Sequence, residues 1–137
     1  MLGWELPPHH TGGMGIACYQ MCKELSSRGI DIEFILPYTA DFSIPFMKVT
    51  PSSSLSATEV MNLGGVYDSE YFAGHGLGKQ FSSHHDYFAR QVAKLASSAE
   101  FDIIHAHDWL TFLAGMEAKR VSGKPLILHV HATQFDQ

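Results

Sequence analysis

The chain has 137 residues, of which 45% are hydrophobic, and its 14 acidic and 9 basic side chains leave a net charge of -5 at pH 7. This length and apolar content suit one domain with a buried core, while the acidic balance excludes the basic surface with which proteins bind nucleic acids or anionic membranes. Because no apolar run approaches the roughly 20 residues of a membrane span and no secretory leader is visible, we expect a soluble, cytoplasmic protein.

The first predicted helix covers residues 13–28. Apolar side chains recur there with the three- and four-residue spacing of an amphipathic helix, at Cys18, Met21, Cys22 and Leu25. Gly29 follows as a stop signal. Cys18 and Cys22, the two cysteines, lie on one face of this helix, so we interpret them as core residues rather than as a disulfide or a metal-binding pair.

The rest of the chain alternates between strand and helix patterns. Residues 30–37 predict a largely buried strand, whereas residues 38–82 are rich in Pro, Ser and Gly and predict irregular chain with one short strand at 46–49. A helix, a strand, a second helix and a last strand are then expected at 84–99, 101–107, 108–123 and 125–132. Asp108 suits the start of that second helix and Gly123 its end. Strands separated by helices predict an α/β fold, a Rossmann-like doubly wound parallel sheet.

A glycine-rich turn joins a first strand, "MLGW" at residues 1–4, to the first helix, and it reads "PPHHTGGMG" over residues 7–15. Glycines at such a turn let a phosphate approach the backbone, and a helix N-terminus favours negative charge. The spacing of Gly12, Gly13 and Gly15 does not match the dinucleotide-binding fingerprint. A tight turn without any ligand would need the same glycines, so both interpretations remain open.

Histidines stand at the ends of two predicted strands, His105 and His107 on one and His129 and His131 on the next. In an open parallel sheet whose order reverses beside the first strand, these strand ends flank the crevice where ligands bind. His107 and His131 come where each strand opens into a loop and are the better candidates for a site. For His105 and His129 we expect a local hydrogen bond inside the strands.

The histidine pairs also raise the question of a metal site, because residues two apart on a strand point the same way. The acid and histidine that complete a dinuclear hydrolase site are missing after His107, since Trp109 and Leu110 stand there. No carboxylate is placed to complete another ligand set, so we expect no metal ligands and no stoichiometric zinc in the purified chain. Among the other histidines we expect only His10, beside the glycine turn, to meet a ligand, and we expect solvated side chains at His9, His84 and His85.

Four segments together resemble a known family: "GWELPPHHTGGMG", "RGIDIEFILP", "FDIIHAHDWL" and "GKPLILHVHATQFD". They are similar, in order, to landmarks of the N-terminal domain of the retaining glycosyltransferases with two Rossmann-like domains, the GT-B type. That family includes glycogen and starch synthases, sucrose-phosphate synthases and many bacterial sugar transferases. The resemblance covers nearly the whole chain apart from residues 38–82. It implies transfer of a sugar from a nucleotide-sugar donor to a carbohydrate acceptor hydroxyl, with the anomeric configuration kept and with no metal or other cofactor.

The same resemblance implies roles for single residues. Gly12 and Gly13 would lie against the donor phosphates, and His107, the catalytic residue of this set, would contact the donor sugar near the reacting centre. His131 would line the same cleft, and Asp108 and His10 complete the substrate-binding set. Glycogen synthases carry a lysine at the position of His10 and an aspartate at that of Ile16, which disfavours glycogen synthase in particular.

In that family a second, C-terminal domain binds the nucleotide with two glutamates and a basic residue. Nothing in residues 1–137 supplies it, so we expect a truncated N-terminal, acceptor-side domain that is inactive alone, with an active full-length parent enzyme. Two other functions remain open. One is a standalone module that binds a sugar or a phosphate, and the other is a small metal-dependent hydrolase built on the histidine pairs.

Overall fold

A parallel sheet organises the computed structural model, which describes residues 1–9, 12–62 and 78–132. Its strands are paired in parallel, β1 with β2 and β3 with β4. Their bounds are Glu33–Leu36 for β1, Lys48–Pro51 for β2, Ile104–His107 for β3 and Leu126–His129 for β4. The short strand predicted at 46–49 therefore lies two residues further on.

The first residues of the chain join the two strand pairs into one sheet. Leu2 makes parallel bridges to Ile35 of β1 and to Ala106 of β3, and its N–H donates a hydrogen bond to the His105 carbonyl at 2.8 Å. The order across the sheet is thus β2, β1, residues 1–3, β3 and β4. The chain builds outward from its first segment in both directions, which confirms the predicted doubly wound topology.

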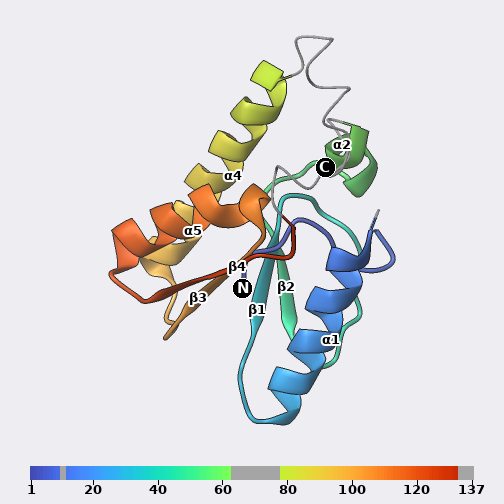
Figure 1. Ribbon diagram of the computed structural model, residues 1–137, viewed down its shortest axis with the longest axis vertical. Coiled ribbons are helices and arrows are strands. Elements are labelled where there is room, and N and C mark those ends of the chain that lie inside the picture. The colour runs from blue at the N-terminus through green and yellow to red at the C-terminus, as the bar shows by residue number, and fades with distance from the viewer. Residues whose placement is uncertain (10–11, 63–77, 133–137) are drawn as a thin grey trace.

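The helices cover both sides of this sheet. Their bounds are Gly13–Ser27 for α1, Ala57–Asn62 for α2, Gly78–Ser98 for α4 and Trp109–Ser122 for α5. In Figure 1, α1 lies on one side of the strands and α4 and α5 lie together on the other. Gly123 ends α5 with a φ of 71°, as predicted from the glycine at that position. Within the described residues, no helix is both long enough and apolar enough to cross a membrane.

One short helix in the region predicted to be irregular was missed. α2 begins with a capping box, in which the Glu59 N–H donates to Ser56 Oγ and the Ser56 N–H donates to Glu59 Oε2 at 2.7 Å. The Ser-Ala-Thr-Glu sequence carries this signal, although the surrounding Pro and Ser residues obscured it. Residues 63–77 of the same region lie outside the described residues.

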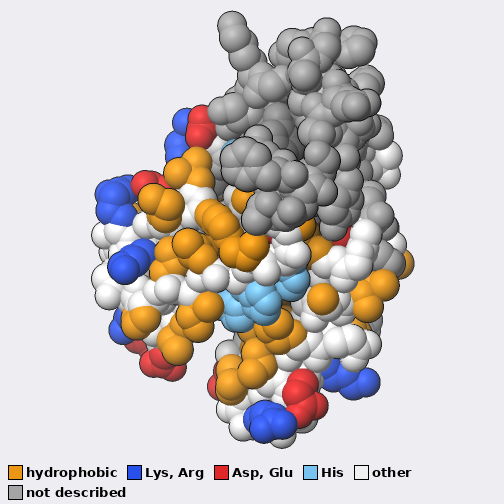
Figure 2. All heavy atoms as spheres, viewed as in Figure 1, with side chains coloured by type: hydrophobic (Ala, Val, Ile, Leu, Met, Phe, Trp, Pro, Cys, Tyr) orange, Lys and Arg blue, Asp and Glu red, His pale blue; other side chains and the backbone are white. Residues whose placement is uncertain are grey.

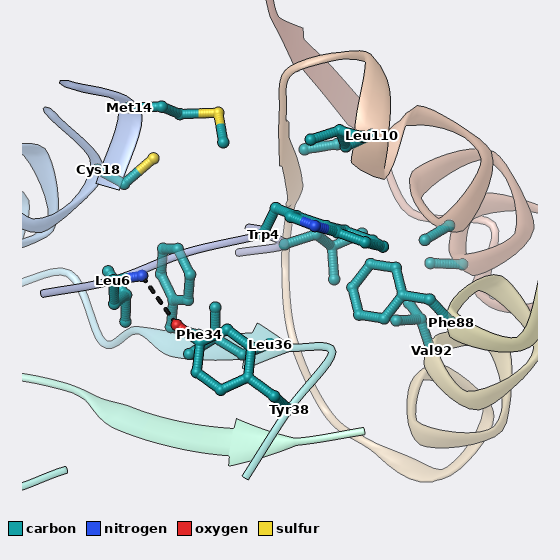
Figure 3. Close-up of a cluster of buried hydrophobic side chains, with 14 of the residues drawn as sticks. Trp4, Leu6, Met14, Cys18, Phe34, Leu36, Tyr38, Phe88, Val92 and Leu110 are labelled. Carbon is teal, nitrogen blue, oxygen red and sulfur yellow. Dashed lines mark hydrogen bonds between the residues drawn. The ribbon is translucent and has the colours of Figure 1, made fainter. Parts of the chain in front are cut away.

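The first segment of the chain is the centre of the core. Leu2, Trp4 and Leu6 are all buried, as expected for a strand covered by helices on both faces. Figure 3 shows the Trp4 ring among side chains of α4 and α5, with Met14 and Cys18 of α1 on the other side of the segment. The Trp4 and Phe88 rings meet edge to face with centroids 5.5 Å apart.

The prediction that His84 and His85 are solvated is wrong. His84 is buried and His85 half-buried, and their rings lie 5.6 and 5.0 Å from the Trp4 ring, edge to face. Both histidines lie in α4, which begins at Gly78, before the predicted start, and they are on the helix face that meets the Trp4 indole. His9 is half-buried near Tyr38, with ring centroids 6.2 Å apart, and is also not a freely solvated side chain.

A glycine in α5 sets how closely that helix approaches the sheet. A Cβ added at Gly115 would lie 2.9 Å from Leu126 Cδ1 and 3.0 Å from Ala106 Cβ. These distances are shorter than carbon atoms tolerate, so Gly115 lets α5 pack directly on β3 and β4. This close packing fixes the helix that follows the histidine-bearing end of β3.

Candidate functional site

Two groups of side chains gather at the carboxyl ends of β3 and β4. One consists of Cys18, His107 and His131, and the other of His105, His107 and His129. Within each group the possible ligand atoms lie within 4.8 Å of one another. Figure 2 shows histidine side chains as a patch in the middle of one face, with hydrophobic side chains on both sides. The structure therefore brings together His107 and His131, as the sequence predicted, and adds Cys18 from α1.

His107 is held rigidly at the end of β3. Its side chain is fully buried, its N–H donates to the Leu2 carbonyl at 3.0 Å, and its carbonyl accepts from Thr111 Oγ1 at 2.9 Å. The ring stacks on Phe34, with centroids 6.3 Å apart. Its Nδ1 lies 3.1 Å from Nε2 of His131, within hydrogen-bond distance, with the donor set by the tautomers.

The second histidine pair repeats this arrangement beside the first. His105 Nε2 lies 3.2 Å from His129 Nδ1, so both have the local hydrogen bond expected of histidines inside strands. The His105 ring stacks on that of His107 at 4.2 Å, and the His129 ring stacks on that of His131 at 4.3 Å. Parallel pairing of β3 with β4 places the four imidazoles in this two-by-two array.

Burial keeps three imidazoles of this array, those of His105, His107 and His131, neutral. Loss of water contact lowers the pKa of His107 to about 2, with a further contribution from His105, His131 and His129. The pKa of His105 falls to about 4, mainly through burial, and that of His131 is lowered for the same reason. Near pH 7 these rings offer hydrogen bonds or lone pairs rather than positive charge.

Asp108 has a strained backbone next to His107. Its φ of 66° and ψ of 166° belong to a region that side chains rarely occupy, at a cost of about 1–3 kcal/mol. The strain is held by one bond to β4 and one to the chain after it, since the Asp108 N–H donates to the His129 carbonyl at 2.8 Å and its Oδ1 accepts from the Ala132 N–H at 3.3 Å. Asp108 precedes α5 as predicted, but its side chain does not cap that helix. Strain of this kind is typical of functional sites.

The glycine turn delivers α1 to the same end of the sheet. Gly12 is the residue before α1 and has extended backbone, and Gly13 opens the helix and is exposed. A Cβ added at Gly13 would meet none of the described atoms within 4 Å. Internal packing in the described part of the chain therefore does not require a glycine there. His10, the other residue predicted at this turn, lies outside the described residues.

The sequence analysis missed Glu5 at this site. Its side chain is buried, with 1% exposed, and its Oε1 accepts a hydrogen bond from the Gly15 N–H at 3.1 Å. A carboxylate at a helix N-terminus is stabilised by the helix dipole, so Glu5 fastens α1 to the first segment. A lone carboxylate within an apolar stretch, "LGWELPP", was the available signal. An anionic ligand at the N-terminus of α1 would therefore lie beside the Glu5 carboxylate, which already accepts a hydrogen bond from the Gly15 N–H.

Comparison with known proteins shows which family this chain resembles. Residues 1–137 match the family model described as starch synthase catalytic domain. An uncharacterized glycosyltransferase of Methanocaldococcus jannaschii is 25% identical over 98% of this chain and 31% of its own length. A D-inositol 3-phosphate glycosyltransferase of Mycobacterium avium is 29% identical over 88% of this chain and 27% of its own.

A glycogen synthase of Caldicellulosiruptor bescii is 28% identical over 74% of this chain and 25% of its own length. The chain therefore spans about a third or less of the length of these curated relatives. No solved structure matches it.

Proposed function

Because the chain belongs to the starch synthase catalytic domain family, we propose that it forms the N-terminal, acceptor-side part of a retaining glycosyltransferase. In this proposal the full-length enzyme moves a sugar from a nucleotide sugar to an acceptor hydroxyl and keeps the anomeric configuration. The reaction needs no metal or other cofactor. The chain spans 31% or less of the relatives described above, which supports a remaining part that contributes the nucleotide site.

The observation that carries the proposal is the environment of His107. Its Nδ1 is engaged by His131, while its buried Nε2 has no hydrogen-bond partner among the described residues. A buried polar atom without a partner costs about 1–3 kcal/mol, which a ligand can recover. We assign this nitrogen to a hydroxyl of the donor sugar, where a neutral imidazole can either donate or accept one hydrogen bond.

We assign the donor phosphates to the turn at Gly12 and Gly13. The exposed Gly13 leaves the backbone open at the positive end of α1. Glu5 already accepts a hydrogen bond from the Gly15 N–H. We therefore place the phosphates at the residues of the turn that precede Gly15 in the sequence. In a retaining transfer negative charge grows on the leaving phosphate, so a second domain must bring the positive charge that the described residues at this end of the sheet do not supply.

The names of the relatives support an acceptor with several hydroxyls. One relative is named for an inositol phosphate and another for glycogen. We propose a carbohydrate or cyclitol acceptor for this protein. The departures at His10 and Ile16 still disfavour glycogen in particular.

Incubation of the full-length protein with a panel of nucleotide sugars and acceptors tests this function. We expect acceptor-dependent release of nucleoside diphosphate and, by NMR, a product with the anomeric configuration of the donor. We expect no release from the chain of 137 residues alone. A product of inverted configuration would contradict the retaining mechanism, and binding of a sugar without transfer would favour the standalone module.

A further inference from the structure

Cys18, His107 and His131 come from three separate elements and meet at one point. Cys18 lies in α1, His107 ends β3 and His131 follows β4, and their ligand atoms all lie within 4.8 Å of one another. The sequence analysis weighed only histidine pairs within one strand, and it placed Cys18 in the core. A set of one thiol and two imidazoles is instead a common ligand set for zinc.

The spacing of the two imidazoles is close to what one ion requires. Tetrahedral zinc with Zn–N bonds of roughly 2.0–2.1 Å holds two nitrogens roughly 3.3 Å apart. Nδ1 of His107 and Nε2 of His131 lie 3.1 Å apart and face each other. An ion can therefore replace their direct hydrogen bond once the two rings turn so that both lone pairs converge on it.

The charges around the three side chains also favour a cation. Both imidazoles are neutral near pH 7, because burial lowers the pKa of each, and a neutral imidazole is the form that binds metal. Burial raises the pKa of the Cys18 thiol to about 12, with smaller contributions from Cys22 and from the negative charges of Glu5 and Asp108. The same negative charges attract a positive ion, while the cost of deprotonating this thiol limits its affinity.

Two further polar atoms beside the three ligands have no protein partner in the described part of the chain. Among the described residues, His107 Nε2 and Asp108 Oδ2 are buried without a hydrogen-bond partner. His107 is completely buried, whereas His131 is half-buried and gives the cluster access to solvent. The competing set of His105, His107 and His129 has no thiol, so we favour the set with Cys18 for a soft ion.

We propose that Cys18, His107 and His131 bind one exchangeable Zn²⁺ ion, with water as the fourth ligand on the side of His131. The three protein ligands leave the open position typical of zinc sites that accept an outside ligand. Binding does not depend on glycosyl transfer. If the proposed function holds, an ion on Nδ1 fixes the His107 tautomer with the proton on Nε2, so that this nitrogen can donate a hydrogen bond to the donor sugar but cannot accept one.

Titration of the purified, chelator-treated chain with Co²⁺ tests the site, because cobalt replaces zinc and reports its ligands by absorption. We expect one equivalent to bind, with the near-ultraviolet charge-transfer band of a cobalt–thiolate bond. Competition with Zn²⁺ should remove the band. Cys18→Ala should abolish it, and His131→Ala should weaken binding by at least about 10-fold.

Cys22→Ala is the matched control, since Cys22 is buried on the same helix one turn away and is not in the cluster. It should keep the band and the affinity. The fold of each variant is checked by circular dichroism without metal. If Cys18→Ala does not fold, the cobalt affinity of His131→Gln, at a half-buried position, tests the site instead. The proposal is wrong if no thiolate band appears, or if cobalt binds Cys18→Ala or His131→Gln as tightly as the unaltered chain.

Discussion

Glu5 Oε1 accepts a hydrogen bond from the Gly15 N–H at 3.1 Å, and this bond ties the central segment of the sheet to the first turn of α1. Both residues are buried. The bond therefore sets where the glycine turn lies relative to the histidines at the ends of β3 and β4. A carboxylate that looks solvent-directed in the sequence is part of the scaffold.

Glu5→Ala should lower the free energy of unfolding by about 1–3 kcal/mol, because it leaves the Gly15 N–H buried without its acceptor. Glu5→Gln should lower it less, since an amide oxygen can still accept the bond. Urea denaturation measures both. Glu24→Ala, which removes an exposed ion pair with Arg28, should change it by less than about 1 kcal/mol. Equal stability of Glu5→Ala and the unaltered chain would show that the bond has no structural role.

Gly115→Ala should destabilise the chain by about 1–3 kcal/mol, as overpacking does in well-packed interiors. The added Cβ would lie 2.9 Å from Leu126 Cδ1, and neither α5 nor β4 can move without disturbing the other. Gly13→Ala is the matched control, because a Cβ there meets no described atom within 4 Å. Alanine is the better helix former by about 1 kcal/mol, so this variant should be at least as stable as the unaltered chain. Thermal unfolding of the pair compares them, and the account of α5 packing fails if the two variants unfold alike.

The free energy of unfolding should fall as the pH is lowered, and the fall should begin at a higher pH than the one at which ordinary carboxylates become protonated. Burial, with a smaller contribution from His84, lowers the pKa of His85 to about 4 from the usual 6.5. The unfolded chain then binds more protons than the folded chain between about pH 6.5 and 4, so stability falls as the pH drops through this window.

Chemical denaturation at pH 7.5, 5.5 and 4.5, with a chelator present, measures this effect. His85→Gln should show a smaller loss of stability between pH 7.5 and 4.5, whereas Arg90→Gln, at an exposed position of the same helix, should show the same loss as the unaltered chain. If His85→Gln has the same pH dependence as the unaltered chain, the buried imidazole does not contribute in this way.

Local patterns were sufficient to predict most of the framework. The apolar spacing in residues 13–28 predicted α1, which ends at Ser27, and Gly123 ends α5 as expected. The strand ends at His107 and His129 also fell at one edge of the sheet, as crossover topology predicted, because parallel strands of one sheet share a carboxyl edge. Each of these features depends on spacing over a few residues or on general rules of chain topology.

Contacts between distant segments could not be predicted in the same way. His84 was assigned to solvent because its burial depends on Trp4, 80 positions away in the sequence. Cys18 meets His107 only because α1 and β3 come together at one end of the sheet. The strain at Asp108 arises from two bonds to the chain around β4, and no local pattern encodes them.

The rate of sugar transfer by the full-length enzyme with His107→Gln tests the central claim most directly. The assay contains a chelator, and thermal unfolding of the same protein is measured beside it to separate chemistry from stability. Loss of a contact that tightens in the transition state costs about 2–4 kcal/mol, so turnover should fall about 30-fold to nearly 1000-fold in a variant that stays folded at the assay temperature. Turnover equal to that of the unaltered enzyme would contradict the assignment of His107 to the donor sugar.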